Sequence, residues 1–287
     1  MSRPLSYALV QAPRVPVGEP LTTFAADVER VAAGLPRGAL LAYPELHLCG
    51  ATGADAHERL RAAAEPLTGA RTRALAELAG DLGVWLLPGT VCEAGPGGEL
   101  FNTALAFSPN GELAASYRKI FPWRPYEPYD RGGDFVVFDA PGLGRIGFAI
   151  CFDAWFPETA RHLAWLGAEV IVNPTQTTTP DRPQEVVLNR ANAIANQVFV
   201  LSVNEAGPEG RGHSLAVDPE GNLLAEAPGA ETAVLTGELD LGSVARVRAA
   251  GTAGVARVWD HFSETDAPLQ LPLYQGRIDP HRWNPAS

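Results

Sequence analysis

The sequence predicts an α/β fold, because apolar stretches of strand length alternate with segments of helical periodicity. Many of these stretches are apolar almost throughout, which is typical of strands covered on both faces. With 287 residues the chain can bury a substantial core. No Ser/Gly-rich linker divides it, so we expect one domain over residues 1–245 and a Pro-rich arm over 246–287 that packs on the body or on a neighbouring subunit.

The expected strands are short apolar runs bounded by Gly, Pro or polar residues. In chain order they cover residues 7–12, 39–45, 83–91, 102–109, 134–140, 145–151, 168–175, 198–204 and 213–219. Turn-forming stretches such as SPNGE and DPEGN lie between them and predict hairpins or loops.

Four segments place apolar residues three and four positions apart, which is the spacing of one helix face. They cover residues 21–32, 75–82, 160–164 and 188–195, and the third is expected to stop at Gly167. Each segment lies between two expected strands, which produces the alternation of an α/β fold.

Composition and charge narrow the possible partners. A net charge of −11 and a pI near 5.0, with no basic run, argue against binding to nucleic acid or to an acidic membrane. The N-terminus lacks the apolar run of a signal peptide, and no stretch has the length of a membrane span. The three cysteines are widely spaced without a CxxC pair, and no metal-ligand spacing occurs. A cytoplasmic protein without metal is therefore expected.

Cys151 stands where the apolar run RIGFAIC gives way to FDAWFPE. A cysteine between a strand and a turn is accessible while its backbone is held rigidly, as in the nucleophile elbows of other hydrolases. The backbone N–H of Phe152 would then be placed to face an oxyanion. Taken alone, a free cysteine is more often a small buried hydrophobe, and a nucleophilic thiol needs a base and a counter-charge.

Charged residues at the ends of other apolar runs supply these partners. Glu45 ends LLAYPE, Lys119 lies in YRKIF, and Glu127 follows eight positions later. Strand ends on one edge of an α/β sheet converge, so these groups are expected to meet Cys151. Taken alone, Glu45 and Lys119 would be a solvated surface pair and Glu127 part of a solvated turn.

Together these segments resemble, in order and spacing, the motifs of the nitrilase superfamily of carbon–nitrogen hydrolases. The matching stretches are YPEL, YRKIF, YEP and GFAICFDAWFPETARHLAWLGAEVIVNPT, followed by GRGHSLAVDPEGNLL. The resemblance covers about residues 5–245. It implies an α/β fold of the nitrilase-like kind, an α-β-β-α sandwich of two packed sheets with helices outside. It also implies a homodimer or a larger homo-oligomer.

The resemblance implies roles for the same residues. Cys151 would be the nucleophile, Glu45 the general base, and Lys119 with the N–H of Phe152 the oxyanion site. Glu127, the second carboxylate, would orient Lys119 or the substrate. The implied reaction is hydrolysis of a small linear amide or N-carbamoyl amine through a thioester, without metal or organic cofactor.

The stretch CFDAWFPE also bears on the substrate. Nitrilases of the superfamily usually carry Trp and Glu directly after the nucleophile, so this chain is closer to the amidase and N-carbamoyl amine amidohydrolase branches, and nitrile hydrolysis is the alternative. Trp155 and Tyr126 are expected to wall an aromatic pocket, and Thr175 begins a loop over its mouth. Three arginines are candidates for binding a substrate carboxylate: Arg124, Arg131 and Arg182.

Other interpretations remain open at this stage. A non-catalytic ligand-binding member of the fold would be expected to lack Glu45, Lys119 or Cys151, and all three are present. Acyl transfer to an amine would use the same residues as hydrolysis. A Cys–His pair with His213 is disfavoured by the position of this histidine inside the GRGHSL signature. Asp153 and Glu158 are expected to cap the helix that follows Cys151.

Overall fold

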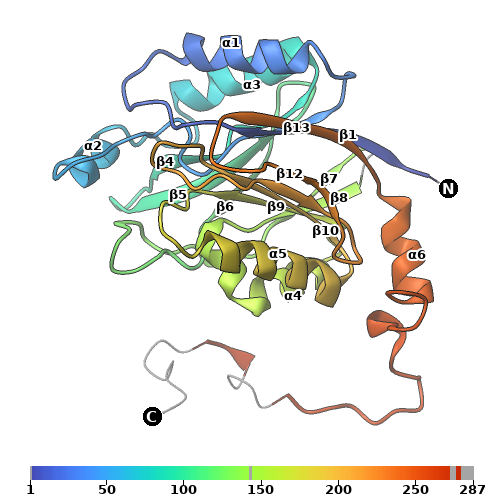
Figure 1. Cartoon of the computed structure of the whole chain (residues 1–287). Coiled ribbons are helices and arrows are strands. Elements are labelled where there is room, and N and C mark those ends of the chain that lie inside the picture. Colours follow the sequence, from blue (N-terminus) through green and yellow to red (C-terminus); the bar gives the residue numbers. More distant parts are fainter. Residues whose placement is uncertain (1, 142–143, 272–275, 279–287) are drawn as a thin grey trace.

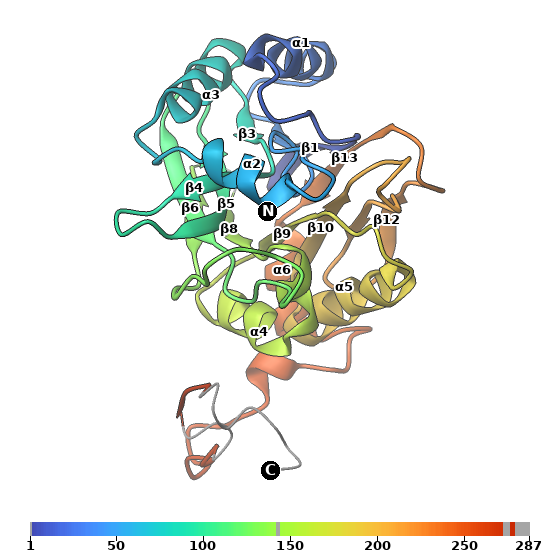
Figure 2. The same cartoon turned by 90° about the vertical axis from the view of Figure 1, so that its left-hand side faces the viewer.

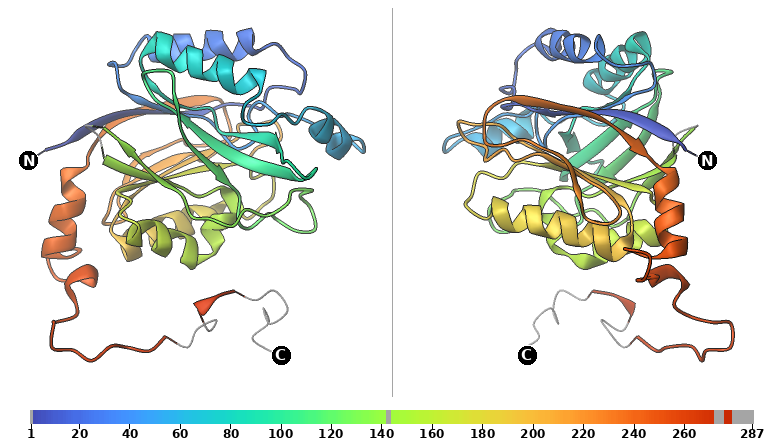
Figure 3. Two further views of the ribbon diagram at one scale, coloured as in Figure 1. Left: turned by 180° about the vertical axis from the view of Figure 1, so that it is seen from behind. Right: turned by 45° about the vertical axis from the view of Figure 1, so that its right-hand side comes forward.

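Two β-sheets pack face to face, and helices cover the outer face of each (Figure 1). The computed structural model describes residues 2–141, 144–271 and 276–278. The same layers are seen after turns of 90°, 180° and 45° (Figures 2 and 3).

The first sheet has the strand order β13-β1-β2-β3-β5-β4, with β6 beside β5. Strands β1, β2 and β3 run parallel, and β13 pairs antiparallel with β1 along its whole length, from Pro4 opposite Asp240 to Gln11 opposite Ala233. The strands are β1 (Pro4–Gln11), β2 (Leu40–Ala42), β3 (Trp85–Leu87), β4 (Thr90–Ala94), β5 (Leu100–Phe107), β6 (Leu113–Arg118) and β13 (Ala233–Asp240).

The second sheet has the order β12-β11-β10-β9-β8-β7. Its centre is the parallel trio β8, β9 and β10, and β9 and β10 are buried at every residue. This burial explains why their sequences are apolar almost throughout. The strands are β7 (Val137–Ala140), β8 (Gly144–Phe148), β9 (Val170–Thr175), β10 (Phe199–Asn204), β11 (Leu215–Val217) and β12 (Leu223–Glu226).

The main helices lie on opposite outer faces of the pair of sheets (Figure 1). Helices α1 (Leu21–Ala32) and α3 (Ala70–Leu82) cover the first sheet, and α4 (Pro157–Trp165) and α5 (Arg182–Asn196) cover the second. Pro157 opens α4, where its missing N–H costs no helical hydrogen bond, and Gly83 ends α3 with a left-handed φ of 65°. Shorter elements are α2 (Ala56–Ala62), η1 (Cys151–Trp155), α6 (Gly242–Ala250) and η2 (Val258–Asp260).

The apolar core has three layers that match this architecture. Leu9 and Trp85 of the first sheet meet Phe148 and Leu201 of the second in the central cluster. One outer cluster joins α1 and α3 to the first sheet, and the other joins α4 and α5 to the second. The predicted α-β-β-α sandwich is therefore confirmed.

The strand boundaries differ from the predicted ones where the backbone turns sharply. The expected strand 83–91 divides into β3 and β4 at Gly89, which has a φ of 83°. A Cβ at this position would lie 1.7 Å from the carbonyl oxygen of Pro44, so only glycine fits. Three strands were not predicted, β6, β12 and β13, because their partly exposed residues do not form apolar runs.

The C-terminal part differs from the expected arm in its first residues. Helix α6 runs through the expected boundary at residue 245, and η2 follows it. Beyond α6 the chain still packs on α4 and α5, where Trp259 Nε1 donates to the carbonyl of Asn196 and Arg161 lies over the indole. The residues after η2 then run below these helices in Figure 1. Residues 272–275 and 279–287 of the expected arm lie outside the described residues. Within the described part, no helix combines the length and the apolar character that a membrane span requires.

Candidate active site

Lys119 lies at the centre of a buried cluster of charges. It directly follows β6, and its Nζ lies 2.8 Å from Oε1 of Glu45 and 2.8 Å from Oε1 of Glu127. Lys119 and Glu45 are almost completely buried, whereas the side chain of Glu127 is 17% exposed. A buried ammonium with two carboxylates is a charge arrangement that folding stability alone rarely selects, because desolvation opposes it.

Glu45 is fixed from three directions. It lies beyond the end of β2, its Oε1 accepts hydrogen bonds from Lys119 Nζ and from Asn102 Nδ2 (2.7 Å), and its backbone N–H donates to the carbonyl of Thr175, the last residue of β9. Burial raises the pKa of the Glu45 carboxyl and Glu127 adds to the rise, while Lys119 and Asn102 oppose it. A carboxylate with a raised pKa is suited to accept and return a proton near neutral pH.

The charge of Lys119 is secured by its partners. Burial by itself lowers the pKa of the ammonium, but the carboxylates of Glu45 and Glu127 outweigh this effect and hold the pKa well above its usual range. Glu127 is itself oriented by the backbone N–H of Trp123, which donates to its Oε2 at 2.9 Å. Lys119 is therefore a fixed cation that donates hydrogen bonds but keeps its proton.

Cys151 lies on the second sheet's side of the same cluster. It follows β8, opens η1, and has a φ of 46°, a left-handed conformation that is strained for a residue with a side chain. Burial and the charge of Glu45 raise the pKa of its thiol, while Lys119 lowers it. The resting group is consequently a thiol that needs a base, and the strained turn presents it in one orientation.

Asp153 ties the turn at Cys151 to the segment that carries Lys119. Its carboxylate accepts hydrogen bonds from the N–H of Ile150 (2.8 Å), the N–H of Phe121 (2.8 Å) and the hydroxyl of Tyr117 (2.7 Å). The predicted capping role is present in the bond to Ile150. The bonds to Tyr117 and Phe121 were not predicted, although an acid inside the apolar stretch ICFDAWF was a signal that it has buried partners.

This site can be compared with those of known proteins. The family model described as "Carbon-nitrogen hydrolase" matches residues 8–249, which is most of the chain. The chain belongs to the carbon–nitrogen hydrolase family. The resemblance to the nitrilase superfamily is thereby confirmed.

Individual relatives of this carbon–nitrogen hydrolase include enzymes named for amides. It is 41% identical over 123 residues to formamidases of Bacillus thuringiensis and Bacillus anthracis, a match covering 42% of this chain and 37% of each formamidase. The aligned part thus spans well under half of those relatives.

Solved structures match over much more of the chain. Nit3 of Saccharomyces cerevisiae, described as a member of branch 10 of the nitrilase superfamily, has a TM-score of 0.77 at 27% identity, with 87% of this chain and 94% of that chain covered. The amidase from Nesterenkonia sp. has a TM-score of 0.70 at 27% identity, with 86% and 94% covered. A variant of that amidase in complex with butyramide has the same score and identity, with 86% and 95% covered.

The other predicted site residues of this carbon–nitrogen hydrolase differ in burial and in their contacts. Phe152 is in the first turn of η1, where a backbone N–H has no acceptor within the helix. Trp155 is half-buried in the same turn. Thr175 is buried with its hydroxyl donated to Asn173, so its backbone carbonyl, not its hydroxyl, contacts Glu45. Tyr126 is 63% exposed and packs on Trp123.

Arg182, a candidate for binding a substrate carboxylate, and His213, considered as a partner of Cys151, both have other partners. Arg182 is buried and bonded to protein acceptors, so it is not available to a substrate carboxylate. The Nδ1 atom of His213 lies 3.6 Å from Oε1 of Glu226, and its side chain is 42% exposed. Arg124 and Arg131 are exposed.

Asn102 is a site residue that the sequence analysis missed. It is a fully buried polar residue in β5, and its amide orients the Glu45 carboxylate. The available signal was a polar residue inside the apolar run FNTALAF, which predicts a buried partner.

Replacing Asn102 by leucine should weaken the base without removing it. The hydrogen bond from the Asn102 side chain favours the ionised form of Glu45, so its loss should raise the pKa of Glu45. The acidic limb of the pH profile of kcat/KM should therefore move to higher pH, and kcat/KM at neutral pH should fall about tenfold. Steady-state kinetics across pH would measure both. Thr103→Val is the matched control, because this neighbour donates its hydroxyl to Glu93 instead. Equal effects in both variants would contradict a specific role for Asn102.

Proposed function

We propose that the protein hydrolyses small linear amides, with formamide and short alkyl amides as the preferred class, through a thioester on Cys151. The observation that carries the proposal is the buried Lys119 ammonium, held between Glu45 and Glu127 beside the strained turn of Cys151. The similarity to formamidases and to the Nesterenkonia amidase supports an amide as substrate.

The first half of the reaction forms the thioester. Glu45 takes the proton of the Cys151 thiol, and the sulfur attacks the amide carbon. The oxyanion that develops is stabilised by the Lys119 ammonium and by the N–H of Phe152, both fixed before the substrate arrives. Glu45 then gives its proton to the leaving nitrogen, the C–N bond breaks, and ammonia departs.

The second half regenerates the enzyme. Glu45, again ionised, takes a proton from water, and the resulting hydroxide attacks the thioester carbon at the same oxyanion site. The C–S bond breaks, the thiolate takes the proton back from Glu45, and the carboxylic acid leaves. Glu127 keeps Lys119 in place throughout, because it accepts a bidentate contact at 2.8 and 3.0 Å.

Ammonia release from a substrate panel tests this proposal. Purified protein should release ammonia from formamide, acetamide and propionamide, and should leave aliphatic nitriles unchanged. N-carbamoyl amines are assayed separately, because the N-carbamoyl amine amidohydrolase branch is expected to use the same catalytic residues. Hydrolysis of nitriles alone, or of carbamoyl compounds alone, would contradict the amide assignment. Product analysis with added amine distinguishes acyl transfer from hydrolysis.

A further inference from the structure

A buried ion pair, Arg182 with Glu185, stands beside the candidate site and has no part in the reaction steps above. Both residues lie in the first turn of α5, they are 1% and 4% exposed, and Arg182 Nη1 lies 3.0 Å from Glu185 Oε2. Burying an ion pair costs desolvation energy that a hydrophobic pair would not cost. Its place therefore suggests a role beyond stability.

Each of the three nitrogens of the Arg182 guanidinium donates a hydrogen bond within the fold. The guanidinium donates to the carbonyls of Gly212 (3.1 Å) and His213 (2.8 Å) and to the hydroxyl of Ser202 (3.1 Å), in addition to Glu185. These acceptors belong to β10 and to the segment before β11. Arg182 is thus an immobile anchor for the carboxylate of Glu185.

Glu185 connects two segments that flank the thiol. Its Oε2 accepts the hydroxyl hydrogen of Thr177, and its Oε1 lies 3.5 Å from Nε1 of Trp155. Trp155 ends the turn that Cys151 begins. Thr177 belongs to the segment after β9, two residues beyond the carbonyl that binds the Glu45 backbone. One carboxylate therefore holds both the turn of the thiol and the neighbouring loop.

The charge of Glu185 also acts on the thiol. Burial is the main cause of the raised pKa of Cys151, and the carboxylates of Glu45, Glu185 and Glu127 add to it, against Lys119. Arg182 in turn experiences the charge of Cys151, which places the whole ion pair within electrostatic reach of the sulfur. The main charged groups acting on Cys151 therefore include Glu45, Lys119, Glu127, Glu185 and Arg182.

We propose that Glu185 is a positioning residue: anchored by Arg182, it fixes the Trp155 indole and Thr177 as one wall of the acyl pocket and so selects short acyl groups. The inference rests on the proposed amide hydrolysis. A closely packed wall held by an ion pair resists the extra methylenes of a longer acyl chain, and each such group discriminates by about tenfold or more.

Glu185→Gln is the direct test, with two readouts. Arg182 and Thr177 both donate to one side of the carboxylate, so the glutamine oxygen should stay there and its NH2 group should face the indole N–H, which then has no acceptor. The ratio of kcat/KM for formamide to that for butyramide should therefore fall about tenfold. The pH midpoint for alkylation of Cys151 should fall, because a negative charge near the thiol is gone while Arg182 stays. A wall with only a structural role would not move this midpoint.

Further variants keep the inference testable if Glu185→Gln alone does not fold. Arg182→Met combined with Glu185→Gln removes both charges together, so the acyl selectivity should be lost while the alkylation midpoint returns close to that of the wild type. Trp155→Phe lacks the indole N–H and should lose selectivity by itself. Adding Glu185→Gln to Trp155→Phe should then cause little further loss.

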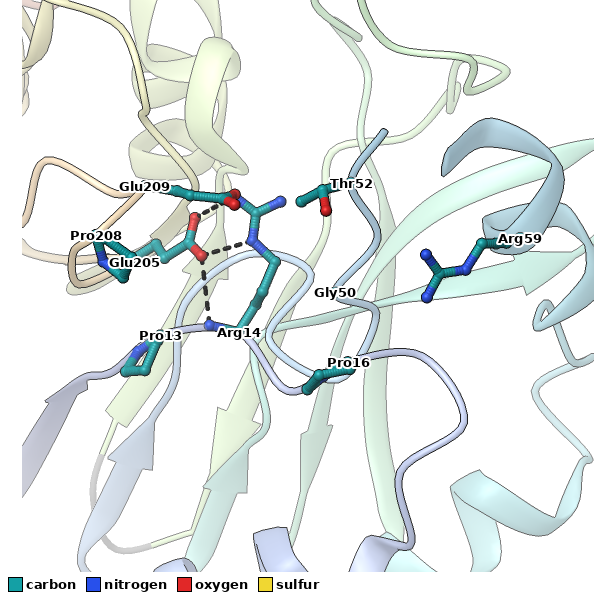
Figure 4. Close-up of a pocket in the computed structure, with 9 residues that line it drawn as sticks. All are labelled: Pro13, Arg14, Pro16, Gly50, Thr52, Arg59, Glu205, Pro208 and Glu209. Atoms are coloured by element: carbon teal, nitrogen blue, oxygen red, sulfur yellow. Dashed lines mark hydrogen bonds and ion pairs between the residues drawn. The ribbon is translucent and has the colours of Figure 1, made fainter. Parts of the chain in front are cut away.

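The chain offers a matched control at the ends of β1 and β10 (Figure 4). There Arg14 binds Glu205 through Nε–Oε1 (2.6 Å) and Nη2–Oε2 (2.8 Å), in the wall of a pocket of about 260 Å³. Glu205 is 2% exposed, as buried as Glu185, but its charge is not among the main charges acting on Cys151. Glu205→Gln should lower stability and leave selectivity and midpoint unchanged.

Each outcome decides the inference. An unchanged selectivity and midpoint in folded Glu185→Gln, or equal changes in Glu205→Gln, would overturn it. The pH midpoint for alkylation of Cys151 is measured without substrate, so it does not depend on amide hydrolysis. A wild-type protein that is inactive on every amide would refute the proposed function alone. In that case an unmoved midpoint still overturns the role of Glu185.

Discussion

Replacing Cys151 by alanine is expected to abolish ammonia release, by at least about 10⁴-fold, while the protein stays folded. The sulfur is the only group at the strained turn that can form the thioester, and alanine removes it without leaving a buried polar atom unpaired. Ammonia release on formamide and a thermal melt would measure the two parts of this expectation.

The other cysteines provide the control for this experiment. Cys92 is buried in β4 and contacts the hydroxyl of Tyr129, so Cys92→Ala should reduce stability but keep turnover. Mass spectrometry after brief alkylation should find the label on Cys151 in the wild type and no label at that position in the alanine variant. Turnover retained by Cys151→Ala would remove the thioester from the mechanism.

Replacing Lys119 by methionine is expected to have the second largest effect. Loss of the oxyanion cation should lower kcat about 10³-fold. The two carboxylates would also be left without their cation, one of them fully buried, which should lower the free energy of unfolding by about 3–5 kcal/mol. Kinetics and chemical denaturation would measure these changes.

The stability loss should depend on pH. Without Lys119, the buried Glu45 beside Glu127 has an even higher pKa, so the folded state binds a proton that the unfolded state releases. Stability then falls as pH rises through the folded-state pKa, and the deficit relative to the wild type should be larger near pH 8 than near about pH 5.5. A deficit independent of pH would show that Glu45 does not take up the proton.

Arg118→Met is the matched control for Lys119→Met. Arg118 is the preceding residue and pairs with Glu93, and its side chain is 39% exposed. Glu93 is buried, with its side chain 4% exposed, so the unfolding free energy should fall in this variant too, whereas turnover should change only slightly because Glu93 does not contact Lys119. A similar loss of turnover in both variants would mean that disturbance of the segment, not removal of the Lys119 charge, is responsible.

The sequence predicted the buried strands because burial on both faces leaves continuous apolar runs, as in β9 and β10. It did not predict β13, because this edge strand alternates partly buried and exposed residues and includes a glycine, and its pairing partner β1 lies more than 200 residues away. Such a pairing depends on register, which local pattern does not contain.

In the site, too, the sequence predicted some side-chain contacts and missed those that depend on how the strands and sheets are packed. Glu45 and Lys119 were predicted to meet because charged residues follow two apolar runs, and the structure places them 2.8 Å apart. Asn102 was missed because its orientation toward Glu45 follows from how β5 lies beside its neighbours. The bonds of Asp153 to Tyr117 and Phe121 cross between the two sheets, and no spacing in the sequence records them.

The pairing of β1 with β13 also has a consequence during synthesis. β1 is synthesised more than 200 residues before β13, so the edge of β1 that pairs with β13 stays open until residues 233–240 have emerged. Unpaired strand edges are templates for aggregation, so the nascent chain exposes an aggregation-prone edge during the interval between the synthesis of β1 and that of β13. Truncation before residue 233 would leave this edge of β1 without its partner strand.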